Sequence, residues 1–391
     1  MCFLRRRFPI ERRPLVMLKV FGWSYAVTAV SLVVAFLYGG PTALFLCVIL
    51  GIMEVSLSFD NAVVNAGILQ RMSDFWQKIF LTVGIVIAVF GMRLVFPLLI
   101  VGVTANLGPI EAINLALEQR PGDDPTSYEY LLNAAHPQIA AFGGMFLLLL
   151  FLDYIFEDRD ITWLTWLEKP LAKIGKLDQL SVVVAAIVLV LSAEFLAKDT
   201  EVVLLSGVLG LVTYLAVNGL GSLFSGAQTG DGDEPAGGAD VADAPTTAET
   251  TKKGPNNLVK ATGKAAFFLF LYLEVLDASF SFDGVIGAFA ITSDPIIIAL
   301  GLGLIGAMYV RSLTIFFVRK GTLQDYVYLE HGAHWAIGAL AAILFISIGV
   351  HVSEIITGLL GVAFIGAAFI SSIMRNRRIA AAEPSVTIAK P

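Results

Sequence analysis

The sequence predicts an all-α, polytopic transmembrane helical bundle with about ten spans and an inverted internal repeat. Of the 391 residues, 57% are hydrophobic and only 15% are charged, and the mean hydropathy is +0.80. Soluble domains contain about half apolar residues or fewer. The apolar runs are roughly 18–28 residues long and lack an alternation of period two, so they predict membrane-spanning helices and not the strands of a barrel.

Ten apolar segments are long enough to be spans. The Arg-rich N-terminus is not followed by a small-residue cleavage site, so the first segment is expected to remain as a helix. The second and seventh segments exceed the ~20 residues that a span needs, which predicts a tilt, a kink or a break. The segments lie at 15–38, 42–69, 79–103, 137–156, 180–197, 201–224, 263–291, 295–318, 333–353 and 355–374.

Lysine and arginine predict the orientation, because cytoplasmic loops carry an excess of both residues. With the N-terminus inside, all but four of the 26 basic residues fall in cytoplasmic segments. The exceptions are Arg120 and Lys198 in outer segments, and Arg93 and Arg311 within spans. An even number of spans places both termini in the cytoplasm. The expected location is the cell (inner) membrane, with membrane lipid as a partner.

A polar linker predicts the domain organisation. Residues 225–257 are rich in Gly, Ala, Asp and Thr and contain three prolines, so they predict a disordered cytoplasmic linker. The linker separates a first membrane half, residues 1–224, from a second, residues 258–375, and a cytoplasmic tail follows at 376–391. The acidic segment 104–136 is expected to be a solvated outer loop. Cys2 and Cys47 support neither a disulfide framework nor a cysteine-based metal site.

Two acidic motifs occur in corresponding spans of the two halves. Aligning them on Ser-Phe-Asp matches Glu54 with Asp277, and each motif is followed by a span with one arginine. The predicted orientations make the copies antiparallel, which is the plan of transporters that bind a substrate between inverted repeats. The first copy contains Glu54, Ser58, Asp60 and Asn61, and the second contains Glu274, Asp277, Ser281 and Asp283.

The carboxylates of these motifs require compensation inside a membrane. Each costs about 2.5–3.5 kcal/mol near the bilayer centre, and two arginines cannot neutralise five acids. A divalent cation together with protons can supply the remainder, and hard cations such as Mn²⁺ take oxygen ligands. The predicted metal ligands are Glu54, Asp60, Asn61, Glu274, Asp277 and Asp283, and the predicted supporting residues are Ser58, Ser281, Arg93 and Arg311.

Helical geometry limits this interpretation. Glu54 and Asn61 share a face, whereas Asp60 lies off that face and Asp283 lies opposite Glu274. Either the Ser-Phe-Asp segments are unwound, or the acids serve different neighbours. The alternative without a metal is a helix–helix clamp in which Asp60 pairs with one arginine and Asp283 with the other.

Two weaker features lie near the predicted cytoplasmic boundary. His331 and His334 have a spacing that suits a metal, but solvated or helix-capping histidines are the favoured interpretation. Trp163 and Trp166 flank a basic loop, which predicts an interfacial helix.

The motifs resemble the paired acidic motifs of the TerC family of integral membrane proteins, in a TerC-like branch of unknown function. The likeness covers about residues 40–105 and 263–375. That family is named for tellurium resistance, several members are associated with manganese efflux, and it is grouped with exporters of the LysE type. The resemblance implies a metal-binding role for the six predicted ligands. Besides the two motifs, it includes Thr292-Ser-Asp-Pro295, Arg311-Ser-Leu and Tyr328-Leu-Glu-His-Gly332.

The predicted function is export of Mn²⁺ or a similar divalent cation, coupled to protons because metal ligands must be deprotonated to bind. The alternatives are a non-transporting scaffold that loads metal onto other proteins and an exporter of basic amino acids. An intramembrane aspartyl hydrolase using Asp60 and Asp283 is disfavoured, because the sequence contexts of such enzymes are absent. We expect no enzyme activity, no organic cofactor and no nucleic-acid partner, and the sequence is compatible with a homo-oligomer.

Overall fold

Helices make up the fold in the part of the chain that the computed structural model describes, which is residues 13–118, 120–177, 179–227, 260–289, 291–292, 294–319 and 325–382. No strand occurs in these ranges. Six of the described helices are long and apolar enough to cross a membrane. The chain is therefore an all-helical protein whose apolar helices indicate a membrane protein. Nearly all of the predicted linker and most of the predicted tail lie outside the described residues.

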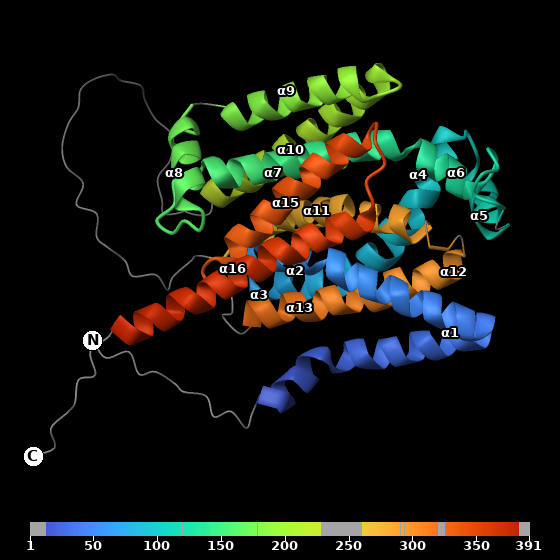
Figure 1. Ribbon diagram of the computed structural model, residues 1–391, viewed down its shortest axis with the longest axis horizontal. Helices are drawn as coiled ribbons and strands as arrows, with labels where there is room; N and C mark the ends of the chain where they lie inside the picture. The colour runs from blue at the N-terminus through green and yellow to red at the C-terminus, as the bar shows by residue number, and fades with distance from the viewer. Residues whose placement is uncertain are drawn as a thin grey trace, which may run out of the picture.

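Helix α1 (Arg13–Leu57) is a hairpin that contains the first predicted span and most of the second. Gly39 (φ −137°, ψ 21°) and Gly40 (φ 68°, ψ −155°) leave the helical conformation, and Pro41 follows them. The positive φ of Gly40 lies in the region that favours glycine, and proline is tolerated in the first turn of a helix. The chain therefore reverses direction at residues 39–41, as Figure 1 shows.

The second predicted span breaks at Ser58, which separates α1 from α2 (Phe59–Leu69). Ser58 has φ −98° and ψ 9°, although its N–H still donates to the Glu54 carbonyl at 2.9 Å. The corresponding segment of the second half lies within the continuous helix α11 (Gly263–Phe289). The expected interruption therefore occurs in the first motif and not in the second.

Each motif helix is followed by a helix with π-helical turns. In the first half these are η2 (Phe80–Gly84) and η3 (Ile87–Val95), between α3 (Asp74–Ile79) and α4 (Phe96–Thr104). In the second half η4 (Ala299–Gly306) lies between α12 (Pro295–Ile298) and α13 (Ala307–Arg319). Such turns are rare, and they are frequent at functional sites.

The other helices complete the bundle and its two ends. In the predicted outer loop the chain forms α5 (Pro109–Leu117) and α6 (Tyr128–Ala134). The long helices are α7 (His136–Phe156), α9 (Leu180–Phe195), α10 (Thr200–Ala227), α15 (Leu329–Ser347) and α16 (Glu354–Ala382). Each of the ten predicted spans overlaps a described helix. The six membrane-length apolar helices include neither α11 nor the shorter apolar helices Phe90–Val103 and Leu180–Phe195, and one of them, Val20–Leu57, contains parts of two predicted spans. The number of spans stays a prediction.

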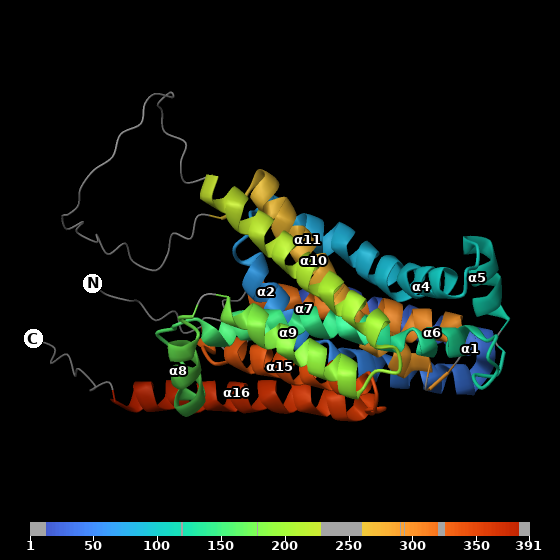
Figure 2. The ribbon, with the colours of Figure 1, turned by 90° about the horizontal axis from the view of Figure 1, so that it is seen from above.

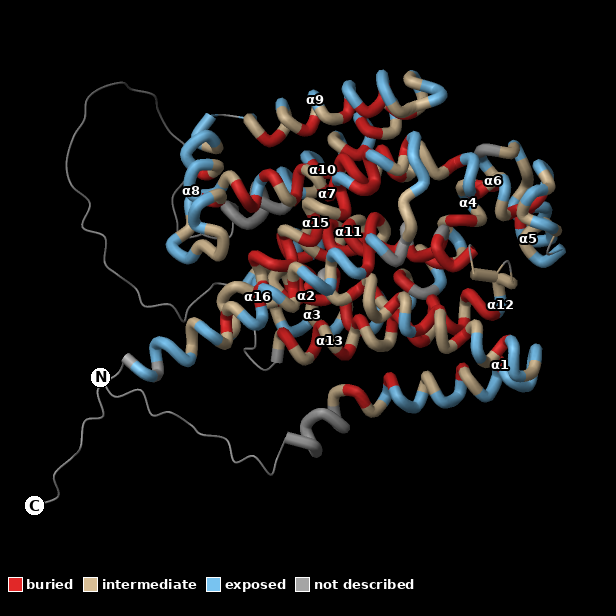
Figure 3. Tube along the Cα trace, viewed as in Figure 1, coloured by how far each residue is buried: buried red, intermediate tan, exposed pale blue. Residues whose placement is uncertain are grey.

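Helix α7 lies in the largest apolar core. It packs against α9, α10, α11 and α15, and Met145, Phe146 and Leu149 are fully buried there. Figure 3 shows this buried interior and the exposed faces of the outer helices. Large apolar side chains such as Trp23 (70% exposed) and Phe195 (77% exposed) lie on those faces. An apolar outer surface of this kind suits contact with lipid.

The described segments predicted to be cytoplasmic lie at one end of the bundle. Figures 1 and 2 place α8 (Thr165–Ile174), the start of α11 and the end of α16 at that end, with α5, α6 and the turn between α9 and α10 at the other. Helix α8 lies across the direction of the long helices. This placement agrees with the expected interfacial helix beside Trp163 and Trp166.

Glu168 holds α8 against the bundle. Its carboxylate accepts hydrogen bonds from the backbone N–H groups of Trp163 (3.0 Å) and Leu164 (3.1 Å) and from Nε1 of Trp335 (3.2 Å). Nδ1 of His331 lies 3.2 Å from the same carboxylate. Burial alone would raise the pKa of Glu168, but His331 and these donors outweigh it and lower the pKa to about 2.

We expect Glu168→Ala to lower the free energy of unfolding by about 1.5–3 kcal/mol, the range for hydrogen bonds to a charged group. The folded pKa is below the value of 4.5 for a free carboxyl, so this stabilisation is complete above pH 4.5 and is lost as the pH falls toward 2. Denaturation of the purified protein in detergent at pH 7 and pH 4 measures both effects. The difference between wild type and variant should shrink at the lower pH.

The matched control for this prediction is Glu201→Ala, because Glu201 is an exposed acid in the first turn of α10. It should cost at most about 1 kcal/mol, through the helix dipole alone. Equal losses in the two variants would show that Glu168 does not anchor α8.

Candidate functional site

Buried polar side chains gather where α1, α2, η3 and α11 meet. The two motifs and the helix after the first motif supply most of them, and this interior is otherwise apolar. A group of this composition inside a membrane bundle marks a functional site more often than a structural one. The buried polar residues of the motifs, of α2 and of η3 are Glu54, Ser58, Asn61, Asn65, Arg93, Glu274, Asp277, Ser279 and Ser281; α1 also buries Ser24 and Ser31 in its first length.

Glu54 and Arg93 form the ion pair at the centre of the first half. Both side chains are 2% exposed, and Nη2 of Arg93 donates to Oε1 of Glu54. Ser58 Oγ donates to the same oxygen at 2.6 Å, and Nη1 of Arg93 donates to the Ala88 carbonyl in η3 at 3.1 Å. The pair therefore has hydrogen bonds beyond its own contact, which a buried ion pair requires to offset desolvation.

Asn61 and Asp277 connect the two motifs directly. Nδ2 of Asn61 on α2 donates to Oδ1 of Asp277 on α11 at 2.5 Å, and both residues are buried. Asp277 also faces Arg93, since both line a cavity of about 30 Å³ together with Asn65. A volume of this size is enough for one water molecule or one small ion.

Glu274 lies one helical turn before Asp277 on α11 and is 6% exposed. Among the described residues, neither of its carboxylate oxygens has a hydrogen-bond partner. The same holds for Oδ1 of Asn65 and Oγ of Ser281. A buried carboxylate without a partner is costly unless it carries a proton or binds a cation.

Glycines make room for the two glutamates in a reciprocal way. A Cβ placed on Gly84 in η2 would lie 2.7 Å from Oε1 of Glu274, and one placed on Gly306 in η4 would overlap Cγ of Glu54. Each glutamate therefore rests against the π-helical segment of the opposite half. The packing of α1 on η4 agrees with the first contact, and α11 packs on η3, the π-helical segment that follows η2 in the same half.

Arg311 extends from α13 toward the first half. Its Nε donates to the Leu81 carbonyl in η2 at 2.9 Å, and its side chain lines the same small cavity as Arg93 and Asp277. Arg93 and Arg311 thus both border the polar cluster. Among the described contacts, Arg93 forms an ion pair with a motif acid, Glu54.

Two of the predicted ligands are placed only by their backbone. Asp60 is the second residue of α2 and Asp283 lies near the end of α11, and their side chains are outside the described ones. No group of three or more His, Cys, Asp or Glu residues in the described part of the chain is arranged to hold a metal ion. The complete ligand set therefore stays a prediction.

Of the two predicted alternatives for His331 and His334, solvated or helix-capping, the solvated one is wrong. His331 is 4% exposed and lies beside Glu168, and His334 is 7% exposed and stacks on Tyr154 with 3.5 Å between ring centroids. Both residues are part of the packing between α15 and the end of α7.

Some residues of the cluster were not predicted as site residues. Asn65 follows Asn61 by four residues and shares its helical face, so the spacing contained a usable signal. Gly84 and Gly306 gave no such signal, because only the packing of the two halves makes their lack of a side chain necessary. At Glu168 the backbone donors of Trp163 and Leu164 are local, whereas the contacts with His331 and Trp335 depend on long-range packing.

These features define a class of protein. It is all-helical, its apolar helices indicate a membrane protein, and a buried cluster of acid, arginine and amide side chains lies between two similar motifs. The chain belongs to the DUF475 family, described as "Protein of unknown function (DUF475)", whose model matches residues 59–379. The match includes Arg93 and all of the second motif, and it begins just after Glu54 and Ser58. No curated protein and no solved structure matches the chain.

We expect Glu54→Gln and Arg93→Gln each to lower the free energy of unfolding by about 3–5 kcal/mol, because each leaves one charge buried without its partner. The double variant should lose less than the sum of the two, by at least about 1 kcal/mol, because the residues are in contact. A double-mutant cycle measured by denaturation in mixed micelles tests this expectation.

The exposed pair Glu157–Arg159 provides the matched control cycle. Its oxygen and nitrogen lie 2.5 Å apart, with side chains 63% and 27% exposed. The coupling there should be below about 1 kcal/mol. A coupling at Glu54–Arg93 as small as in this control would contradict a buried, desolvated pair.

Proposed function

We propose that this protein is a membrane transporter that exports Mn²⁺ or a similar divalent cation in exchange for protons. The observation that carries the proposal is the contact between the two motifs, where Asn61 of the first binds Asp277 of the second next to the Glu54–Arg93 pair. Oxygen-rich side chains from both halves thus meet at one buried place. Carboxylates that exchange protons for metal couple the two fluxes directly.

We further propose that the two halves are inverted repeats. The second length of α1 and helix α11 run in opposite directions along the bundle, as do the η2–α4 and η4–α13 segments (Figures 1 and 2). Each half also packs a motif glutamate on a glycine in the π-helical segment of the other half. Glu54 meets Gly306 and Glu274 meets Gly84, and although the motif alignment matches Glu54 with Asp277, these contacts support a similar arrangement of the two halves. So do the π-helical turns that follow each motif. Transporters of this plan bind their substrate at the interface of the repeats.

The distribution of paired and unpaired acids in the two motifs supports a cation as the substrate. Arg93 neutralises Glu54, whereas Glu274 has no described partner and Asp277 has an amide donor. The described acids of α11 therefore have no ion pair of their own, and one of them, Asp277, lines a cavity of about 30 Å³ that Arg93 and Arg311 also line. This volume favours an ion over a basic amino acid. The likeness to the TerC family, with its association with manganese efflux, supports the same choice.

In this proposal the chain crosses the cell membrane ten times with both termini in the cytoplasm. Cysteines introduced at Lys198 and Lys264, with Cys2 and Cys47 replaced by serine, test the orientation. An impermeant maleimide applied to intact cells should label position 198 and not position 264. Labelling of position 264 alone, or of both positions, would contradict this topology.

We expect cells that lack the gene to accumulate Mn²⁺, and expression of Asp60→Asn or Asp283→Asn not to reverse this accumulation. Either change keeps the shape of the side chain and removes one negative ligand. A metal-accumulation profile by mass spectrometry measures the effect across all divalent ions. The control is Asp160→Asn, which alters an exposed aspartate outside the cluster and should restore export.

Flux in reconstituted vesicles separates transport from the scaffold alternative. Wild-type protein should move Mn²⁺ across the vesicle membrane in response to a pH gradient, and the two Asp→Asn variants should not. If metal resistance is equal in the variants and the wild type and the vesicles show no flux, the scaffold function is correct.

A further inference from the structure

Helix α8 carries three different surfaces around its axis. The surface docked on the bundle contains the buried residues Glu168 and Ala172, followed by Gly175. A Cβ on Gly175 would overlap the carbonyl of Phe156, so only glycine permits this close contact with the end of α7. Docking fixes the directions in which the two other surfaces face.

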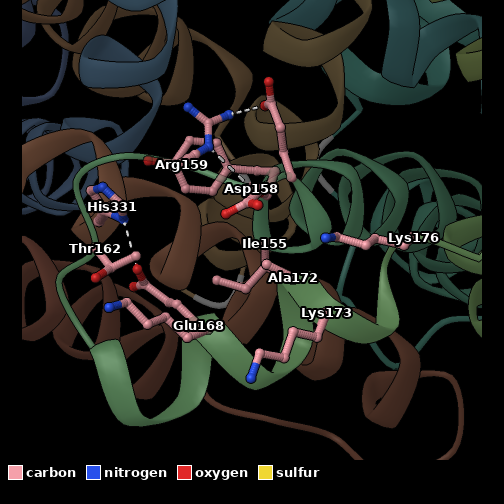
Figure 4. Close-up of a pocket in the computed structure, with 12 residues that line it drawn as sticks. Ile155, Asp158, Arg159, Thr162, Glu168, Ala172, Lys173, Lys176 and His331 are labelled. Carbon is pink, nitrogen blue, oxygen red and sulfur yellow. Dashed lines mark hydrogen bonds and ion pairs between the residues drawn. The ribbon is translucent and has the colours of Figure 1, made fainter.

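The second surface is basic. Lys169 and Lys173 each follow a docked residue by one position, which places them about 100° around the helix from the bundle. Lys176 comes directly after the last turn. All three lysines line a cavity of about 180 Å³ between α8, the end of α7 and α15 (Figure 4).

The acidic residues of this cavity are largely neutralised by groups other than the lysines. Glu157 pairs with Arg159, whose guanidinium also lies 3.8 Å from the centre of the Tyr154 ring. Glu168 is held by His331 and by backbone donors. In the described part of the chain no ion pair involves the three lysines. Asp158 is the remaining acid, so the cavity keeps a net positive charge.

The third surface is apolar and faces away from the bundle. Trp166 is 75% exposed on α8, Ile174 is 51% exposed, and Leu177 just beyond the helix is 63% exposed. By helical spacing Trp166 and Ile174 lie opposite the docked surface, and Lys169 and Lys173 lie between the two surfaces. An amphipathic helix with basic residues beside exposed Trp and aliphatic side chains is typical of a membrane interface.

We propose that this cavity binds the phosphate of an anionic phospholipid, with the lipid tails beside the apolar surface of α8. Lysine binds phosphate as a point charge, and basic pockets at the cytoplasmic ends of membrane helices bind acidic headgroups. The adjoining apolar surface selects a lipid over free phosphate. The site lies at the end of the bundle and is independent of the acidic cluster, so it holds whether or not the protein transports metal.

The test uses the full-length wild-type protein in nanodiscs made either of phosphatidylcholine or of phosphatidylcholine with phosphatidylglycerol. Brief acetylation followed by mass spectrometry reports the reactivity of each lysine. Phosphatidylglycerol should slow acetylation of Lys169, Lys173 and Lys176 at least threefold. Lys264, which lies at the same end of the bundle outside the cavity, and Lys198, at the other end, should change little.

Two outcomes would overturn the proposal. Equal protection of Lys264 would mean that the anionic surface protects every nearby lysine without a site. Equal protection by inorganic phosphate in phosphatidylcholine discs would identify a free anion as the ligand.

A second measurement uses variants to test whether the three lysines bind the lipid. Lys169→Gln/Lys173→Gln/Lys176→Gln should retain about 10- to 100-fold less phosphatidylglycerol in native mass spectrometry, since each basic residue near an anionic lipid contributes about fivefold. The matched control is Arg375→Gln/Arg377→Gln/Arg378→Gln on α16, which removes the same charge at the same end. Similar losses in the two triple variants would refute a site built by α8.

Discussion

The cost of burying charge inside an apolar bundle is the constraint on which the rest of this structure depends. Glu54 and Arg93 are both almost inaccessible to solvent, and each would be strongly unfavourable without the other. Their pairing determines what surrounds them. Ser58 and the Ala88 carbonyl complete the hydrogen bonds of the pair, and Gly306 gives Glu54 the space to lie between the two halves.

An asymmetry between the halves follows from this pairing. Glu54 of the first half pairs with an arginine that follows it in the chain, whereas Glu274 has no hydrogen-bond partner among the described residues and Asp277 faces the same Arg93 without an ion pair. Among the described side chains, the negative charge without an ion pair therefore lies on the second motif, and the first supplies an amide through Asn61. In our account the cation binds between α11 and α2, where Asn61 adds an amide ligand and Asp60 a carboxylate, while the Glu54–Arg93 pair stays intact.

Sequence patterns predicted much of this arrangement, because helical periodicity acts locally. The helices, including α8 beside Trp163, follow from spacing along one chain segment. The identity of contacts between segments did not follow. The pairing of Arg93 with Glu54, the hydrogen bond from Asn61 to Asp277 and the need for glycine at positions 84 and 306 arise only when the two halves pack. The two motifs are similar in sequence, so they do not reveal that the helix is interrupted at Ser58 but continuous in α11. The burial of His331 depends on where α8 docks.

The central claim is that two motifs build one cation site, and the stoichiometry of binding tests it most directly. Electron paramagnetic resonance of Mn²⁺ titrated into the purified protein measures free and bound ion. Our account predicts one bound Mn²⁺ per chain, with binding lost when Asp277 of the second motif is changed to Asn and also when Asn61 of the first is changed to Leu. Two ions per chain, with one retained in each variant, would show that the motifs bind separately and would contradict a shared site.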